Sequence, residues 1–433
     1  MKYFRLFSIL AFLIMYAHVS HAQAKKPTRK KVIVSASAKC SAKADSLELV
    51  KFNKALNGTD WTKPWNLSKP MIAWEGVSVS KSGCVTEIVL SNNNLTGSLP
   101  ALNLPGLVQL MIEEKKVTGV IPAFTGLPNV KSLIIISPGI SGPFPVLDKN
   151  IALEVLNMDC PQLTGDIPTL DKQLKLEELY LNSNLTGNIP EFTKQSKLQY
   201  LAISGPKIAG SLPSFNFLPQ LLDIKITNTA IDGSIPGFKS NPELKSIDLS
   251  NNHLTGSIPL LNTPVKLEYL NLSNNQLTGA IPKLENMNQL IELNLSSNTL
   301  NGNLPQFYLP RLSILNLSKN QLSGIIPDFH SIPSIHQIEL SNNALNGPIP
   351  DFSKIPLLEK LNLSKNALSG EIPDFSHVSN LLDLYIHDNA LTGKITDFSH
   401  LPNLVTLHIQ NNKFKGKAPK FKKCINLRNL KTS

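Results

Sequence analysis

The amino-acid sequence predicts an α/β repeat solenoid with a parallel β-sheet on one face and a short helical cap at its N-terminal end. Two observations predict this class. A leucine-containing unit recurs every 22 or 23 residues, fifteen times, starting at Val85 and ending with the unit at Leu404. At the start of each unit, apolar residues alternate with polar ones, which is the period of a short strand. A repeat of this length indicates a solenoid in which each unit packs only against its neighbours.

The shared pattern of the units is LxxLxLxxNxLTGxIPxFxxLPx, and residues 267–282 (LEYLNLSNNQLTGAIP) follow it closely. The fourth and sixth positions supply buried strand residues. The asparagine at position nine is expected to turn inward and bond backbone groups that the bend leaves unpaired. The glycine allows a backbone conformation that other residues avoid, and Ile-Pro fixes an extended segment. The units start at Val85, Leu107, Val130, Leu153, Leu176, Leu198, Leu221, Leu244, Leu267, Leu290, Leu312, Ile335, Leu358, Leu381 and Leu404.

This pattern resembles the plant-type class of leucine-rich repeats, and the resemblance covers about residues 85–430. It implies a right-handed leucine-rich repeat superhelix of about 15 repeats, with the parallel sheet on a concave face used for binding. It also implies a second strand at the Leu-Thr-Gly-x-Ile-Pro segment. The sequence NGTDW (57–61), followed by Trp74-x-Gly-Val-x-Val, resembles the caps of secreted leucine-rich repeat proteins of Bacteroidetes-type bacteria. Ser78 stands where the plant cap usually has a cysteine.

The domain organisation is expected to begin with a signal peptide at 1–22 and a basic leader without regular structure at 23–44. An N-terminal cap follows at 45–84, then the solenoid at 85–426 and a C-terminal end at 427–433. Lys2 and Arg5 precede an apolar run that is too short to span a bilayer, which favours a cleaved signal over an N-terminal anchor. The mature chain is therefore expected to have no membrane span, and to be secreted or held at the cell surface or cell envelope.

The cap is expected to contain an amphipathic helix at about 45–56. Trp61, Trp65 and Trp74 are expected to be buried over the exposed end of the solenoid core.

Net charge excludes one class of partner. The chain has a formal net charge of +11, but the basic residues are concentrated near its two ends. Residues 44–412 hold 25 basic and 31 acidic residues, a net charge of −6. A nucleic-acid-binding protein would show a basic stripe along its working face, so no nucleic-acid partner is expected. The basic ends either keep the termini solvated or contact an anionic envelope.

The cysteines leave one candidate disulfide, between Cys40 and Cys84. Cys160 and Cys424 are eleven coils apart, roughly 50 Å, which exceeds the reach of a disulfide. The Asn-x-Ser motifs at position five of several units are interpreted as variation of the repeat. Asn57 and Asn66 in the cap are better glycosylation sequons, but only in a eukaryotic source.

Candidate binding residues are those that depart from the repeat on the strand face. Position five of the central units is a column of asparagines, interpreted as solubilising filler. Two groups depart from it, and ordinary surface variation is the alternative for each. The first, in repeats five to seven, is Glu177, Glu178, Tyr180, Tyr200, Asp223 and Lys225; the second, in repeats fourteen and fifteen, is Asp383, Tyr385, His387, Asp388 and His408. Several N-terminal repeats also lack the position-nine asparagine and carry Lys115, Pro138, Pro161, Pro206 or Thr229 instead.

No catalytic, cofactor-binding or metal-binding residues are expected. His387 and His408 are estimated to lie about 8 Å apart at Cβ, too far to share a metal ion readily. No phosphate-binding loop, nucleophile elbow or HExxH motif occurs in the sequence. The sequence therefore predicts a monomeric binding protein without a cofactor that recognises a protein ligand on the concave face. The alternatives are binding of a glycan or envelope polymer, with tyrosines stacking on sugars, and a structural adhesin or spacer.

Overall fold

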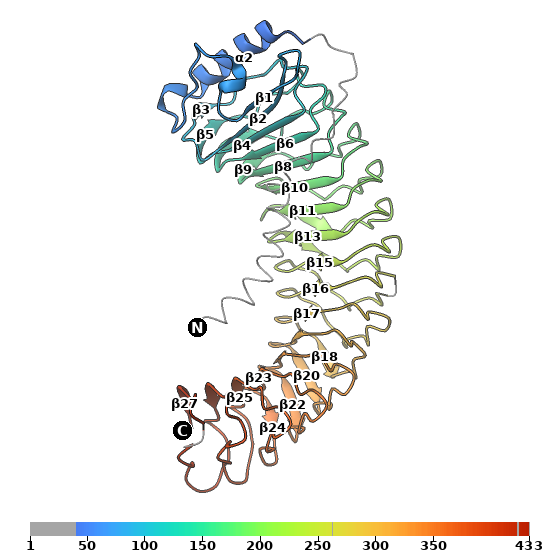
Figure 1. Cartoon of the computed structure of the whole chain (residues 1–433). Coiled ribbons are helices and arrows are strands. Elements are labelled where there is room, and N and C mark those ends of the chain that lie inside the picture. The colour runs from blue at the N-terminus through green and yellow to red at the C-terminus, as the bar shows by residue number, and fades with distance from the viewer. Residues whose placement is uncertain (1–39, 262, 422–423, 433) are drawn as a thin grey trace. The chain divides into compact units, whose positions relative to one another are not determined.

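The computed structural model describes residues 40–261, 263–421 and 424–432 (Figure 1). The predicted fold class is confirmed: the chain is a leucine-rich repeat solenoid of about fifteen turns with a parallel sheet and little helix. The predicted signal peptide (1–22), and the part of the basic leader before Cys40, lie outside the described residues.

One sheet of seventeen strands runs through all the repeats, and strands that follow one another along the chain are neighbours in the sheet. Only β1 is antiparallel to its neighbour; all later pairs are parallel and in register. The strands are β1 (Val77–Val79), β2 (Val85–Ser91), β4 (Gln109–Glu113), β6 (Ser132–Ile136), β8 (Val155–Cys160), β10 (Glu178–Ser183), β11 (Tyr200–Ser204), β13 (Asp223–Thr227), β15 (Ser246–Asp248), β16 (Tyr269–Asn271), β17 (Glu292–Asn294), β19 (Ile314–Asn316), β21 (Gln337–Glu339), β23 (Lys360–Asn362), β25 (Asp383–Tyr385), β26 (Thr406–His408) and β27 (Asn429–Lys431).

The Leu-Thr-Gly segments form three smaller parallel sheets. This is the second strand that the resemblance to plant-type repeats implies. The glycine of this segment has a positive φ throughout; at Gly210, with φ +82°, an added Cβ would also clash with the Asn188 side chain. The strands are β3 (Thr96–Ser98), β5 (Lys116–Gly119), β7 (Gly139–Pro143), β9 (Gln162–Thr164), β12 (Ala209–Ser211), β14 (Ala230–Asp232), β18 (Asn301–Asn303), β20 (Gln321–Gly324), β22 (Ala344–Gly347) and β24 (Ala367–Leu368).

The core is a continuous stack of leucines and phenylalanines. The leucines at positions one and four of each unit, such as Leu267 and Leu270, are fully buried. In several coils a phenylalanine of the return segment stacks on that of the next coil, as Phe352 does on Phe329 and Phe375 with ring centroids 6.3 Å apart. Phe352 has φ +54°, a conformation that costs about 1–2 kcal/mol for a residue with a side chain. Burying the ring contributes about 1.5–3 kcal/mol, so packing offsets the strain.

The N-terminal cap consists of helix α2 (Ala42–Ala55) and two single-turn 3₁₀ helices, η1 (Gly58–Asp60) and η2 (Met71–Ala73). The helix begins inside the range predicted as leader, because the Ser41 side chain accepts a hydrogen bond from the Ala44 amide and caps its first turn. Trp61, Trp65 and Trp74 are buried. The ring centroid of Trp65 lies 4.9 Å from that of Trp61 and 5.1 Å from that of Trp74.

Two of the links between the cap and the solenoid lie at the start of the helix. A disulfide connects Cys40 and Cys84, with the Cα atoms 5.9 Å apart. The Asp45 carboxylate accepts a hydrogen bond from the Val85 amide at 2.8 Å. The first strand of the solenoid is therefore attached to the start of the helix both covalently and by a charged hydrogen bond.

The asparagines at position nine form a ladder through the C-terminal half of the solenoid. The Asn275 amide group donates to the carbonyl of Leu249, in the preceding coil, and to that of Leu272. Its carbonyl oxygen accepts from the Leu254 amide at 3.0 Å. Each such asparagine therefore pairs backbone groups of two successive coils.

The N-terminal half uses other residues for the same purpose. Repeats two, three and four lack the asparagine, and the residue one place earlier is buried instead: Glu114, Ser137 and Cys160. Glu114 accepts from the Leu95 amide, and Ser137 donates to the Val117 carbonyl. The strands of the large sheet have five to seven residues from β2 to β13, and three residues in β1 and from β15 onward. The two halves of the solenoid therefore differ in strand length and in the side chains that bond the turning backbone.

Candidate functional site

The strand face of the central repeats is built from side-chain pairs that satisfy each other's hydrogen bonds. In repeat nine, the Asn271 side chain accepts from both the amide and the hydroxyl of Ser273, at 3.1 and 2.7 Å. The same pair occurs in four other repeats, as Asp248 with Ser250, Asn294 with Ser296, Asn316 with Ser318 and Asn362 with Ser364. The interpretation of these residues as solubilising filler was therefore incomplete, because they also hold the chain in its bend after the strand.

The first predicted group comes together on strands β10, β11 and β13. Glu178, Tyr200 and Asp223 are direct partners across the sheet, at position three of their units. Tyr180 and Lys225 lie in the next column, at position five, on either side of Ala202. Glu177 lies one residue before β10 and outside these columns.

The structure extends this group by three residues that the sequence analysis did not select. Asp248 is the position-five partner of Lys225, and Tyr269 and Glu292 continue the position-three column beyond Ser246. The sequence analysis selected Glu178, Tyr200 and Asp223 of the position-three column, but its group ended at repeat seven and so missed the continuation of both columns into repeats eight to ten. We name these residues together the central acidic face: Glu178, Tyr180, Tyr200, Asp223, Lys225, Asp248, Tyr269 and Glu292.

Electrostatics show that the carboxylates of the central acidic face interact. Burial, reinforced by the nearby Asp248 carboxylate, raises the pKa of Glu292 to about 7. Asp248 is only 5% exposed, and burial raises its pKa against the opposing effect of its bonds from Ser250 and of Lys225. Burial and neighbouring carboxylates also raise the pKa of Tyr180 and of Tyr269. This surface therefore favours a positively charged group over a negatively charged one.

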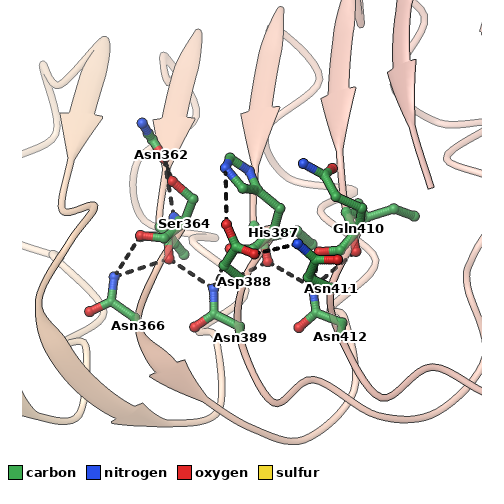
Figure 2. Close-up of polar contacts among 12 residues, drawn as sticks. Asn362, Ser364, Asn366, His387, Asp388, Asn389, Gln410, Asn411 and Asn412 are labelled. Carbon is green, nitrogen blue, oxygen red and sulfur yellow. Dashed lines mark hydrogen bonds and ion pairs between the residues drawn. The ribbon is translucent and has the colours of Figure 1, made fainter. Parts of the chain in front are cut away.

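The second predicted group comes together on β25 and β26, and its polar surroundings are drawn in Figure 2. Tyr385 and His408 are direct partners across the sheet, with ring centroids 5.0 Å apart and nearly perpendicular planes. His387 follows β25, and its ring centroid lies 5.8 Å from that of His408. Nε2 of His387 is 3.8 Å from the Asp388 carboxylate, whose other oxygen accepts from Asn411 at 2.6 Å.

The remaining predicted residue, Asp383, is at position three of β25, between Lys360 and Thr406. Lys360 also forms an ion pair with Glu339 at 2.8 Å. The predicted residues of repeats fourteen and fifteen therefore share one surface with charged residues of the two preceding repeats.

Three buried polar atoms of this surface have no hydrogen-bond partner among the described residues. They are Nδ1 of His387, Nε2 of His408 and the side-chain oxygen of Gln410. Leaving a buried polar group unpaired costs about 1–3 kcal/mol, so the arrangement destabilises the folded chain. Gln410 was not predicted, although it occupies the position that carries serine in the central repeats.

Within residues 40–261, 263–421 and 424–432, no three His, Cys, Asp or Glu side chains are placed to hold a metal ion. Among the same residues, no helix has the length and apolar character needed to cross a membrane.

Comparisons with known proteins agree with this architecture. The family model described as Leucine Rich Repeat matches residues 243–261, 266–285, 311–331 and 357–377. A search of curated proteins found no match to the sequence.

Similar solved structures include two plant receptors. The plant peptide hormone receptor RGFR1, in complex with RGF2, has a TM-score of 0.77 and 27% identity, covering 83% of this chain and 60% of that one. The Arabidopsis receptor kinase HAESA, in complex with the peptide hormone IDA and the co-receptor SERK1, has a TM-score of 0.73 and 29% identity, covering 90% of this chain and 73% of that one. The chain thus spans less than two thirds of the RGFR1 structure.

A bacterial protein shares the fold. A leucine-rich repeat protein of Leptospira interrogans has a TM-score of 0.61 and 23% identity, covering 72% of this chain and 80% of that one. This last likeness concerns the fold alone. The repeats and the receptor structures together support a leucine-rich repeat protein of the plant type.

Proposed function

We propose that this chain is an exported binding protein that recognises a protein or peptide ligand, at or outside the cell surface, through the central acidic face. The observation that carries the proposal is the grouping of three tyrosines and four carboxylates around a single lysine on successive strands. Tyrosine offers apolar area and a polar tip, and it is enriched where proteins bind each other. The repeats form a ligand-binding scaffold, and the proposal assigns no catalytic step to it.

The charge of the central acidic face specifies the ligand further. Glu178, Asp223, Asp248 and Glu292 outnumber Lys225, and burial together with the Asp248 carboxylate raises the pKa of Glu292. A ligand segment with arginine or lysine beside apolar residues would supply that charge and cover the tyrosine rings. One of the similar plant structures is a peptide hormone receptor, and the other is in complex with the peptide hormone IDA, which supports a peptide ligand here.

Export is part of the proposal, and it is supported by the basic and then apolar N-terminal sequence. We further propose that the protein acts as a monomer, and that its cap is of the type found in secreted bacterial leucine-rich repeat proteins.

The test is a selection of random short peptides displayed on phage against the purified protein. Selected peptides are expected to be rich in lysine or arginine. Their dissociation constants, measured by fluorescence anisotropy, should rise at least about ten-fold in the Tyr180→Ala/Tyr269→Ala variant. Tyr308→Ala is the matched control, since Tyr308 is 55% exposed and lies outside the large sheet.

Two results would contradict the proposal. One is that selected peptides bind the double variant and the wild type equally. The other is that no peptide binds saturably, which would favour the structural adhesin or spacer instead.

A further inference from the structure

Repeats fourteen and fifteen lack the hydrogen-bonded pair of positions five and seven that is present in repeats eight to eleven and in repeat thirteen. In repeat thirteen, Asn362 at position five accepts two hydrogen bonds from Ser364 at position seven (Figure 2). The equivalent residues in repeats fourteen and fifteen are Tyr385 with His387, and His408 with Gln410. The rings of Tyr385, His387 and His408 pack against one another, on or directly after the adjacent strands β25 and β26. Two neighbouring repeats have therefore exchanged a structural pair for larger side chains at the same positions.

The exchange leaves hydrogen-bonding capacity unused. His408 is only 9% exposed, yet its Nε2 has no partner among the described residues, and the same is true of the buried Nδ1 of His387 and the buried oxygen of Gln410. The Asp388 carboxylate near Nε2 of His387 favours the tautomer with its proton on that nitrogen. Nδ1 is then an acceptor, and the Gln410 oxygen can only accept. A matching ligand must donate at least two hydrogen bonds here.

The charges around this site balance. Three carboxylates and three ammonium groups act on Tyr385 and His387: Asp383, Asp388 and Glu339 against Lys360, Lys365 and Lys431. Burial, the nearby His408 ring and the lysines keep the pKa of His387 below its ordinary value despite Asp388, so its ring is neutral at pH 7. A guanidinium or ammonium group would gain little from such surroundings, in contrast to the central acidic face.

We propose that the strand face of repeats fourteen and fifteen binds a neutral saccharide. Sugar hydroxyls donate to Nδ1 of His387 and to the Gln410 oxygen, and a hydroxyl donates to or accepts from Nε2 of His408, once these covered side chains turn toward the sugar. The partly exposed ring of Tyr385 covers the apolar C–H face of the sugar. This site is separate from the central acidic face and takes a ligand of a different class.

The test uses an array of neutral oligosaccharides, followed by titration calorimetry with the best soluble one. The decisive variant restores the repeat's own pair, Tyr385→Asn with His387→Ser, a combination that the fold already accommodates in repeat thirteen. It is expected to weaken binding at least about ten-fold and to leave the melting temperature unchanged or higher, because unpaired polar atoms are removed. A second variant, His408→Asn with Gln410→Ser, should have the same effect. The Tyr180→Ala/Tyr269→Ala variant is the control and should bind the sugar as the wild type does.

Three outcomes would overturn the proposal. They are an array on which no neutral saccharide binds, folded restored-pair variants that keep full affinity, and a preference for acidic glycans or for basic peptides. The control, Tyr180→Ala/Tyr269→Ala, is also the variant that tests peptide binding. Loss of sugar binding and loss of peptide binding are therefore measured on different variants, and each proposal can fail while the other stands.

Discussion

At the scale of single residues, Glu292 is the most unusual charged group of the strand face. It lies between Tyr269 and Ile314 on neighbouring strands, and the Asp248 carboxylate acts on it electrostatically. Its environment is therefore partly apolar and partly negative, and both effects disfavour the carboxylate. Burial first, and then Asp248, raises its pKa from the ordinary 4.5 to about 7.

The stability of the folded chain should depend on pH through the titration of Glu292. Because the pKa of Glu292 is higher in the folded chain than in the unfolded chain, its favourable contribution is complete below pH 4.5 and is lost as the pH rises to about 7. Glu292→Gln mimics the protonated form. The variant should be about 1–3 kcal/mol more stable than the wild type at pH 8, and equal to it at pH 4, in urea unfolding followed by circular dichroism.

The control for this prediction is Glu285→Gln, which removes an equally negative but exposed side chain. A stability gain of Glu292→Gln that is the same at both pH values would show that the carboxyl group is not the cause.

At the scale of one coil, the asparagine ladder connects neighbouring repeats more specifically than the leucine core does. Leucine packing tolerates small shifts, whereas the three bonds of Asn275 to Leu249, Leu254 and Leu272 fix where the chain turns. The sequence predicted this inward-turned role from the pattern alone. It did not predict that Glu114, Ser137 and Cys160 take the role one residue earlier in the N-terminal repeats. The spacing of the repeats predicts the usual ladder position. Which side chain bonds the backbone groups of the preceding coil depends on where the longer strands end.

The Asn275→Ala variant should be about 2–4 kcal/mol less stable, because it loses these bonds and leaves buried backbone groups unpaired. Asn301→Ala, at an exposed position of β18, should change stability by less than about 0.5 kcal/mol. Urea unfolding of the three proteins gives the comparison. If the two variants had equal free energies of unfolding, the ladder hydrogen bonds would make no net contribution to stability.

At the scale of the whole molecule, each coil contacts only its neighbours, so stability is local. The cap covers the core of the first repeat with three tryptophans, and the Cys40–Cys84 disulfide closes a sequence separation of 44 residues. A crosslink of that span stabilises by about 2–4 kcal/mol. In a solenoid this effect should be confined to the cap and the first coils.

Reduction of the disulfide should therefore increase hydrogen exchange in α2, β1 and β2, and leave β19 to β26 unchanged, as measured by mass spectrometry. The Cys40→Ser/Cys84→Ser variant should show the same local increase and no further response to reductant. A uniform increase along the chain would argue against nearest-neighbour stability.

The sequence by itself determined the fold class, the strand positions within each unit, the ladder asparagines and the two groups of departing residues. These features follow from the repeat pattern, because it assigns each position of a unit to a place in the coil and makes residues that depart from the pattern visible. Only the tertiary structure decided which columns meet across coils. It added Asp248, Tyr269 and Glu292 to one surface, and it showed that His387, His408 and Gln410 have buried atoms without a hydrogen-bond partner in the part of the chain that the structure describes. The physical reason is that a repeat pattern fixes which face a side chain occupies. Charge coupling and hydrogen-bond satisfaction depend instead on distances between side chains of different coils.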